Sequence, residues 1–322
     1  MMRFCLKFVP LALLTAGCAA DDAVDAFTSP SDMEGWDLIW SDEFDGSSID
    51  GSIWGFDIDC WGGGNNERQC YTDNIKNASL EDGKLVITAH KEESAGPALP
   101  THLRKTAEDR KAINTKPFTS ARLTTKDKAS WRYGRIDVRA KLPQGQGTWP
   151  AIWMLPEDND YGSWAASGEI DIMEAVNLGI ACKECPGGLE NTIMAALHFG
   201  GLWPDNKKAD TEVPLPGSLD DFHTYTIVWS EGRFDWLVNG RHIATKTAED
   251  WFTTASDDPH APFDKPFHLI LNLAIGGRLS EDRGAGGVSE DGFPKRFEVD
   301  FVRVWQCTER PVNPHNCIDS GE

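Results

Sequence analysis

The residues best suited to chemistry lie in one short segment, G-E-I-D-I-M-E at 168–174, where three carboxylates are interspersed with apolar side chains. Successive side chains of a β-strand point to opposite faces, so Glu169 and Asp171 share one face. Strict alternation would place Glu174 on the apolar face, where an unpaired carboxylate is costly. One extra residue at about 172–173, a β-bulge, would return Glu174 to the face of the other two acids. We therefore expect three carboxylates to line one cleft.

Carboxylates arranged in this way can hydrolyse a glycosidic bond. A retaining glycosidase uses one carboxylate as nucleophile and one protonated carboxyl group as general acid, roughly 5 Å apart. A third acid between them would help to keep a proton on a neighbour through like-charge repulsion. The alternative for a lone E-x-D pattern is a solvated acidic strand face. The apolar alternation and the tryptophans around the segment favour the catalytic interpretation.

The strands that must position these acids recur along most of the chain, with turn residues between them. Strand patterns occur at residues 36–46, 85–89, 120–125, 133–142, 149–155, 194–199, 223–229, 233–238, 267–272 and 297–305. No stretch shows sustained helical periodicity, which predicts an all-β fold, a sandwich of two curved antiparallel sheets. We expect one domain over residues 36–306, with loops at 91–117 and 177–190.

Composition and charge narrow the class of partner. Among 322 residues, 51 acidic and 31 basic side chains give a net charge of −20. This charge disfavours nucleic acid, anionic membrane surfaces and heavily sulfated polymers. The 13 tryptophans suit flat aromatic surfaces of the kind that stack on sugar rings. We expect a neutral polysaccharide as the partner and a monomeric protein.

The N-terminal 17 residues are typical of an export signal, with basic residues followed by the apolar run 8–14, which is too short to span a bilayer. The segment L-T-A-G-C at 14–18 resembles a bacterial lipoprotein cleavage box, with Cys18 as the lipidated residue. Thr15 replaces the usual leucine, so cleavage by the ordinary signal peptidase stays an alternative. Ala19 after the cysteine favours the outer membrane of a Gram-negative cell. Residues 18–35 are polar and small, as in a tether.

Six cysteines remain after this leader, and an even number in an exported chain indicates disulfides. Proximity in the sequence suggests, without fixing, the pairs Cys60 with Cys70, Cys182 with Cys185, and Cys307 with Cys317; the last would close a tail at 307–322. The C-K-E-C segment at 182–185 could instead be a redox motif or half of a zinc site, but no second C-x-x-C completes a zinc set.

Several motifs together carry a family resemblance. They are W-S-D-E-F at 40–44, G-G-G-N-N-E at 62–67, Y-G-R-I-D-V-R-A-K-L-P at 133–143, G-T-W-P-A-I-W-M-L-P at 147–156, the acidic segment at 168–174, L-H-F-G-G at 197–201 and L-I-L-N-L-A-I-G-G at 269–277. In order and spacing they resemble glycoside hydrolase family 16, and within it the laminarinases, which are endo-acting β-1,3-glucanases. The resemblance covers residues 36–306 and implies a β-jelly-roll with an open cleft.

The resemblance also implies roles for individual residues. Glu169 would be the nucleophile, Glu174 the general acid and then base, and Asp171 an acid coupled to both, or else a structural hydrogen-bonding acid. Trp149, Trp153 and Trp164 flank the acidic segment and would stack on glucose rings, with packing in the core as the alternative. His198 would hydrogen-bond the leaving sugar, unless it is a buried structural histidine.

Further residues match binding positions of similar enzymes. Asn66 and Arg122 would contact sugar hydroxyls on the non-reducing side, whereas the role of Glu67 is open. A structural Ca²⁺ would be held by Glu43, the Gly83 carbonyl and Asp300, with a solvated acid pair as the alternative. No cofactor is expected for catalysis.

The resemblance leaves the polysaccharide open. A mixed-linkage β-glucanase, or an agarase- or carrageenase-type galactanase, shares the implied fold. A non-catalytic glucan-binding protein is the rival from another functional class. Such binding relatives generally lack the catalytic glutamates, both of which are present here. Arg68, Cys70, the C-x-x-C loop and residues 279–292 depart from the laminarinase pattern and put the geometry of the sugar-binding subsites in doubt.

Overall fold

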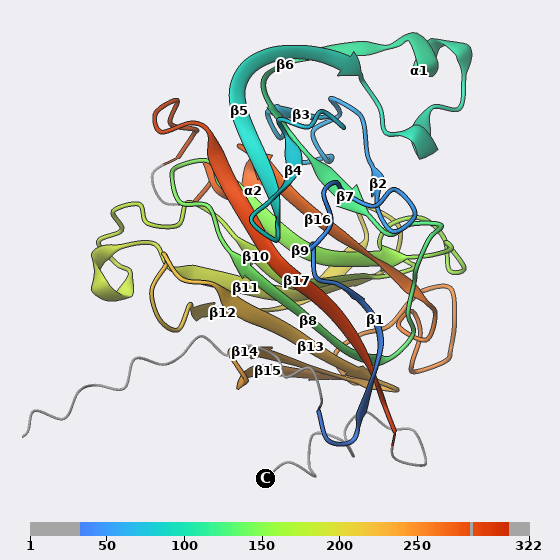
Figure 1. Cartoon of the computed structure of the whole chain (residues 1–322). Coiled ribbons are helices and arrows are strands. Elements are labelled where there is room, and N and C mark those ends of the chain that lie inside the picture. The colour runs from blue at the N-terminus through green and yellow to red at the C-terminus, as the bar shows by residue number, and fades with distance from the viewer. Residues whose placement is uncertain (1–32, 284–285, 309–322) are drawn as a thin grey trace, which may run out of the picture.

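The computed structural model describes residues 33–283 and 286–308, which fold into two β-sheets packed against each other (Figure 1). The larger sheet contains β1 (Trp36–Asp42), β3 (Gln69–Tyr71), β4 (Ala78–Glu81), β5 (Lys84–Pro97), β6 (Ile113–Ser120), β8 (Gly134–Lys141), β13 (His223–Ser230), β14 (Arg233–Val238), β15 (Arg241–Thr247) and β17 (Lys295–Cys307). The smaller sheet contains β2 (Gly55–Phe56), β7 (Arg122–Thr124), β9 (Thr148–Pro156), β10 (Glu169–Ala175), β11 (Thr192–Gly200), β12 (Asn206–Pro214) and β16 (Phe267–Ile275).

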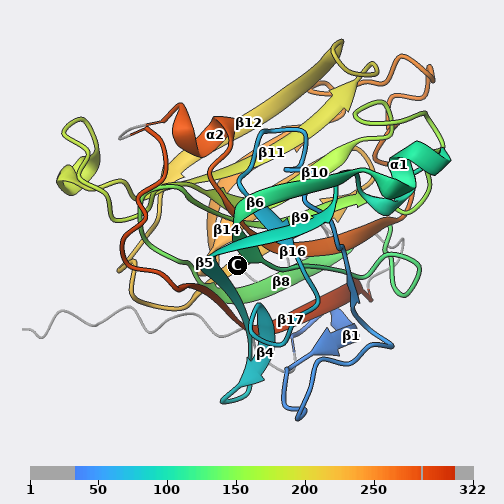
Figure 2. The ribbon, with the colours of Figure 1, turned by 90° about the horizontal axis from the view of Figure 1, so that it is seen from above.

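The strand order places the acidic segment inside a sheet. The smaller sheet runs β12-β11-β10-β9-β16-β7-β2, so β10 has two neighbours on one side and four on the other. The larger sheet runs β15-β14-β13-β8-β17-β5-β6-β3, with β1 paired to β17 and β4 paired to β5. All pairs of these strands are antiparallel except β3 with β6. The predicted all-β sandwich of curved antiparallel sheets is therefore confirmed (Figure 2).

Helical structure within the described residues is limited to short turns. These are α1 (Ala107–Lys111), α2 (Arg278–Glu281) and the 3-10 turns Thr101–Leu103 and Pro186–Gly188. None of the helices in this part of the chain is long and apolar enough to cross a membrane.

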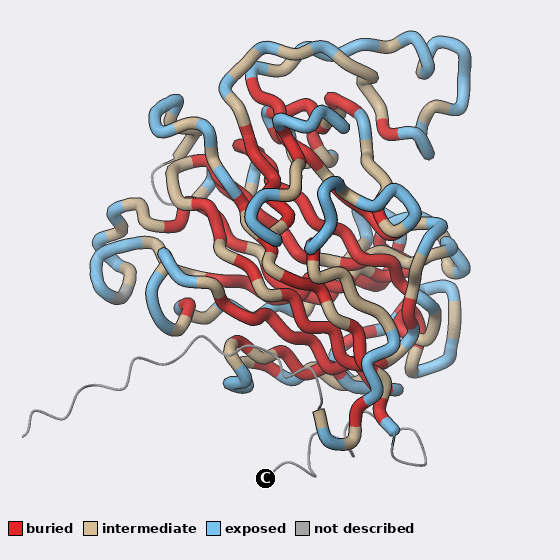
Figure 3. The backbone as a smooth tube through the Cα atoms, in the orientation of Figure 1, coloured by how far each residue is buried: buried red, intermediate tan, exposed pale blue. Residues whose placement is uncertain are grey.

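The core lies between the two sheets and is built by alternation along the strands. In β9, Ile152 and Met154 are fully buried, whereas Trp153 between them is only partly covered. From the larger sheet, Trp229, Phe234 and Trp236 fill the interior, and their rings stack in sequence. Figure 3 shows that the central stretches of the strands are buried and that exposure concentrates in the loops. The outer face of the smaller sheet is left to carry polar side chains.

The segment predicted as a loop at 91–117 is instead mostly a long β-ribbon. β5 continues to Pro97 and pairs with β6 from Ile113 onward, and α1 lies at the far end of the ribbon (Figure 1). Both faces of this ribbon are polar and partly exposed, so the sequence carries no hydrophobic alternation there. Backbone pairing and polar side-chain contacts, such as that of Lys116 with the Glu67 carbonyl, hold it together. By contrast, the loop predicted at 177–190 is confirmed apart from its 3-10 turn.

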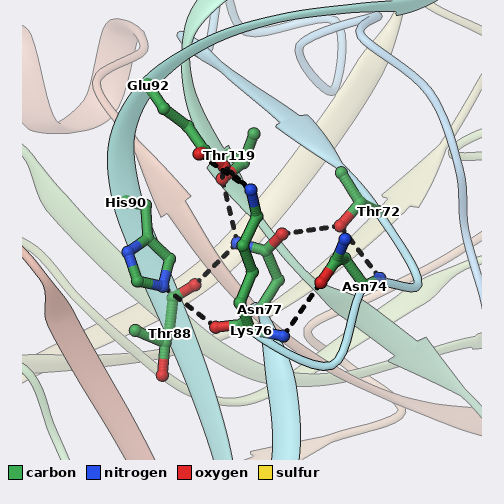
Figure 4. A network of polar contacts seen from close by, with 8 residues as sticks. All are labelled: Thr72, Asn74, Lys76, Asn77, Thr88, His90, Glu92 and Thr119. Carbon is green, nitrogen blue, oxygen red and sulfur yellow. Dashed lines mark hydrogen bonds and ion pairs between the residues drawn. The ribbon is translucent and has the colours of Figure 1, made fainter.

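A buried polar network attaches the loop before β4 to the base of this ribbon (Figure 4). The side-chain amide of Asn77 donates to the Thr88 carbonyl and to Thr119 Oγ1, both at 3.0 Å. Its own oxygen accepts a hydrogen bond from Thr72 at 2.6 Å. Because every polar atom of this buried amide is satisfied, the network fixes the loop without the cost of an orphaned group.

Two of the suggested disulfides are present, Cys60–Cys70 and Cys182–Cys185. The second excludes the zinc interpretation of the C-x-x-C segment in this state. Cys307 is also disulfide-bonded, and its suggested partner Cys317 lies outside the described residues. Cys18 and the leader lie outside them as well.

Candidate active site

The predicted bulge is present in β10. In the pairing with β11, Glu169 lies opposite His198, Asp171 opposite Ala196 and Glu174 opposite Met194. Asp171 and Glu174 are three residues apart, whereas their partners are two residues apart, so β10 contains one extra residue at this point. The register against β9 shifts at the same place, between Asp171 and Met173. Paired residues of antiparallel strands share a face, and the partners on β11 are evenly spaced. All three carboxylates therefore project from the outer face of the smaller sheet, while Ile170 and Met173 are buried beneath them.

The carbonyl at the bulge is held from the opposite sheet. Trp236 of β14 is almost fully buried, and its indole Nε1 donates to the Asp171 carbonyl oxygen at 3.0 Å. The register shifts begin directly after Asp171 on both sides of β10. A bulge leaves backbone groups without strand partners, and buried ones must find others. Trp236 thus supplies the donor that the irregular strand needs.

Two tryptophans hold the outer acids through their indole N–H groups. Trp149 Nε1 donates to Glu174 Oε1, and Trp164 Nε1 donates to Glu169 Oε2, each at 2.8 Å. Trp149 is 8% exposed and Trp164 37% exposed. The sequence indicated these residues as stacking or core residues. The structure shows a further task, because each indole fixes one carboxylate and stabilises its charged form.

His198 lies between the acids. Its Nε2 is 3.2 Å from Asp171 Oδ2 and 3.7 Å from Glu169 Oε1, and its ring centroid lies 5.7 Å from that of Trp164. Burial opposes a charge on the imidazole, but the hydrogen bond to Asp171 and the surrounding carboxylates outweigh it and raise the pKa of His198 to about 9. The histidine is therefore a cation at neutral pH and belongs to the carboxylate cluster.

The pKa values of both outer acids are raised. Burial, reinforced by the charge of Asp171, raises the pKa of Glu169 to about 7, against the opposing effects of His198 and the Trp164 hydrogen bond. Burial and Asp171 likewise raise the pKa of Glu174 to about 8, and the charge of Glu169 adds to that rise. Both carboxyl groups therefore bind a proton more strongly than ordinary glutamates do, and the cluster can hold a proton near neutral pH. The arrangement supplies one acid and one base.

Trp153 lies on the same face, in a second buried network. Its Nε1 donates to Asn272 Oδ1 at 2.7 Å, and Asn272 donates in turn to the Tyr71 hydroxyl at 3.0 Å. Glu67 accepts from Gln69 at 2.7 Å and is buried, which raises the pKa of its carboxyl group. The Tyr71 hydroxyl donates to Glu67 Oε2 at 3.4 Å, so residues of β16, β3 and the loop before β3 form one network that ends at the Trp153 indole.

Arg122 covers Trp153. Its guanidinium carbon lies 4.8 Å from the Trp153 ring centroid, and its Nε lies 2.9 Å from Asp57 Oδ2. Burial lowers the pKa of Arg122, but the surrounding acids, Asp57 first, outweigh burial and raise it. A fixed, charged guanidinium beside a partly exposed aromatic ring can contact a sugar hydroxyl.

Asn66 lies in a loop next to this face. It is exposed and has a left-handed backbone, with φ of 63°. Arg278 N donates to the Asn65 carbonyl at 2.8 Å, and an ideal Cβ on Gly277 would lie 3.2 Å from the Trp149 ring. Glycine at 277 therefore lets the loop approach Trp149 closely. The structure brings Asn66 to the rim of the face that carries the acids.

The residues predicted to hold Ca²⁺ already have partners. Both carboxylate oxygens of Glu43 accept hydrogen bonds from Arg303, at 3.0 and 2.9 Å. Asp300 accepts from Arg139 at 2.6 Å, and Gly83 lies in the turn between β4 and β5. As they stand, these side chains are neutralised by arginines and do not fit a cation. Calcium binding stays a prediction that requires both ion pairs to open.

Sequence reasoning missed Asn272, Tyr71 and Trp236. A lone asparagine in the apolar run L-I-L-N-L was a usable signal, because a buried amide needs partners. Tyr71 and Trp236 carry no such signal, since their partners lie far away in the sequence.

Comparison with known proteins gives a consistent result. Residues 67–301 match the family described as glycosyl hydrolases family 16. The chain is 38% identical over 298 residues to Glucan endo-1,3-beta-glucosidase A1 of Niallia circulans, covering 89% of this chain but only 40% of that longer protein. It is 39% identical to Glucan endo-1,3-beta-glucosidase of Cryptopygus antarcticus, covering 84% of this chain and 92% of that one.

A solved structure agrees. The laminarinase from Rhodothermus marinus superimposes with a TM-score of 0.67 at 37% identity, covering 85% of this chain and 98% of the other.

Proposed function

The chain belongs to glycosyl hydrolases family 16, and on that premise we propose that it is an endo-β-1,3-glucanase that hydrolyses laminarin-type β-glucans with retention of configuration. The observation that carries the proposal is the bulged strand β10, which puts Glu169, Asp171 and Glu174 on one face with an indole donor on each outer acid. The similarity to two endo-1,3-beta-glucosidases supports the choice of linkage.

We assign the reaction steps to these residues. Glu169 attacks the anomeric carbon while Glu174 gives its proton to the glycosidic oxygen, so the leaving sugar departs as a neutral alcohol. Glu174, now ionised, takes a proton from water, whose oxygen attacks the same carbon and releases Glu169. Trp149 occupies Glu174 Oε1, so we place the transferred proton on Oε2. Asp171 and His198 do not react; their ion pair maintains the electrostatic environment of the two glutamates.

A panel of polysaccharides tests the proposal. The purified protein is incubated with laminarin, mixed-linkage glucan, agarose and κ-carrageenan, and the release of reducing ends is followed. We expect the highest rate on laminarin. Release from agarose or κ-carrageenan alone would move the assignment to a galactanase, and laminarin binding without any release would favour a glucan-binding protein.

The nucleophile has its own test. Glu169→Ala should lose activity and regain turnover with azide, giving a glycosyl azide of inverted anomeric configuration. Undiminished hydrolysis by Glu169→Ala would remove this residue from the mechanism.

We also propose that the chain is exported and held at the outer membrane by a lipid on Cys18, with residues 18–35 as a tether before the domain at 36–306. The apolar run and the L-T-A-G-C segment support this. A Cys18→Ser protein that still fractionates with membranes would count against lipidation.

Ca²⁺ at Glu43 and Asp300 would show as a lower melting temperature after EDTA treatment, and an unchanged temperature would oppose it.

A further inference from the structure

An exposed aromatic patch adjoins the acidic cluster. The large hydrophobic side chains exposed in the described part of the chain include three aromatic ones, Trp164, Trp203 and Phe252. Trp203 is 71% exposed, Phe252 49% and the neighbouring Leu202 52%. All belong to loops next to the Glu169 end of β10. Clustered exposed aromatic and aliphatic side chains of this kind mark binding surfaces.

The patch is tied to the catalytic acids by hydrogen bonds. Trp203 N donates to the Trp164 carbonyl at 3.2 Å, and Trp164 Nε1 donates to Glu169 at 2.8 Å. Gly200 N donates to the Phe252 carbonyl at 3.0 Å, and the Phe252 ring lies 5.7 Å from that of Phe199. The patch therefore continues the active site, because Trp203 is hydrogen-bonded to Trp164, whose indole holds Glu169.

Strand order places the patch on one side of the bond that is cleaved. Arg122 and Trp153 lie on β7 and β9, on one side of β10. The loop 201–205, which contains Trp203, joins β11 to β12 on the other side (Figure 1). Lys208 of β12 pairs with His198, so its side chain extends the same face beyond the cluster. A polymer that crosses β10 must pass over β11 and β12 beside Trp203.

We propose that Trp203 and Phe252 continue the surface begun by Trp164 and stack against sugar units on the reducing-end side of the scissile bond. The inference rests on the proposed function, in which Asn66 and Arg122 take the non-reducing side. Uncharged aromatic rings suit the apolar faces of a neutral glucan. The surface holds the leaving part of the chain while Glu174 protonates the bond.

A pair of substrates tests this inference. The first is laminarin, which extends over several units beyond the bond. The second is an aryl glycoside of laminaribiose, in which only the aryl group lies beyond the bond. For Trp203→Ala we expect kcat/KM on laminarin to fall about tenfold, equivalent to about 1.4 kcal/mol, and that on the aryl glycoside to change less than about twofold. Transfer of glycosyl units to added laminaribiose should fall with the laminarin rate.

The matched control is Ile75→Ala, which removes a side chain that is 79% exposed and lies in the loop before β4. It should leave both rates unchanged. Equal rates for Trp203→Ala and wild type on laminarin would overturn the inference, as would an equal loss on both substrates.

If wild type cleaves no β-1,3-glucan, the proposed function fails, and affinity electrophoresis in laminarin then decides the inference separately. Weaker retardation of Trp203→Ala than of Ile75→Ala would support the surface, and equal retardation would overturn it.

Discussion

The bulge that turns Glu174 outward receives one hydrogen bond from the opposite sheet, and Trp236→Phe removes it. The substitution keeps an aromatic ring in the core but deletes the Nε1 donor that reaches the Asp171 carbonyl at 3.0 Å. That carbonyl is buried, so leaving it without a partner costs about 1–3 kcal/mol of unfolding free energy. Loss of part of the ring adds a cavity cost of its own.

Trp229→Phe separates the two costs. Trp229 is as deeply buried as Trp236 and lies in the same aromatic cluster, but its Nε1 has no hydrogen-bond partner within the described residues. Both substitutions delete the same atoms. We therefore expect Trp236→Phe to be less stable than Trp229→Phe by about 1–3 kcal/mol in urea denaturation.

Activity provides the second measurement. Without the indole donor, β10 can relax around Asp171 and move Glu174 relative to Glu169, and a displacement of about 1 Å costs about 100-fold in rate. We expect kcat on laminarin to fall about 10- to 100-fold in Trp236→Phe and to change less than about twofold in Trp229→Phe. Equal stability and equal kcat in the two variants would refute the reasoning, because strand pairing alone would then hold the bulge.

Three further predictions concern protons. Asp171→Asn removes the charge that raises the pKa of both outer acids, so both limbs of the pH profile of kcat/KM should move to lower pH; an unchanged profile would contradict the coupling. Trp149→Phe removes a hydrogen bond that lowers the pKa of Glu174, so the basic limb should move to higher pH while the acidic limb stays. A buried carboxyl group whose pKa is raised from 4.5 to about 7 destabilises the fold as it ionises, so wild-type stability should fall between about pH 5 and about pH 8. Urea denaturation of Glu169→Gln at the two pH values should show a smaller fall, and an equal fall would remove Glu169 as its source.

The sequence predicted the acidic face because two physical rules agreed there. Alternation assigned Glu169 and Asp171 to one face, and the cost of burying Glu174 required an extra residue. The register of β10 against β11 contains that residue. The strands of the core were predictable for the same reason, since each has one apolar face against the other sheet.

The strands that the sequence did not predict lack an apolar face. β12 and β15 are edge strands rich in charged residues, and the end of β5 is polar on both sides. Edge strands are often protected by charge, which erases the pattern that would reveal them.

The hydrogen-bond partners of these side chains could not be predicted from the sequence either. Trp236 and Asp171 are 65 residues apart, and Asn272 and Tyr71 are 201 apart. The sequence indicates that an indole needs an acceptor but not which one it meets.

The two outer acids share the main causes of their raised pKa values and differ in their charged neighbours. Glu169 and Glu174 are both withdrawn from solvent, both repelled by Asp171 and both held by an indole. Glu169 lies beside the His198 cation and also experiences the charge of Arg122, which favour its ionised form. For Glu174, the charge of Glu169 is a further cause that raises the pKa, and it is larger than the opposing effect of His198. These neighbours suit Glu169 to the role of ionised nucleophile and Glu174 to that of proton donor, so two acids on one strand acquire different roles from the residues packed around them.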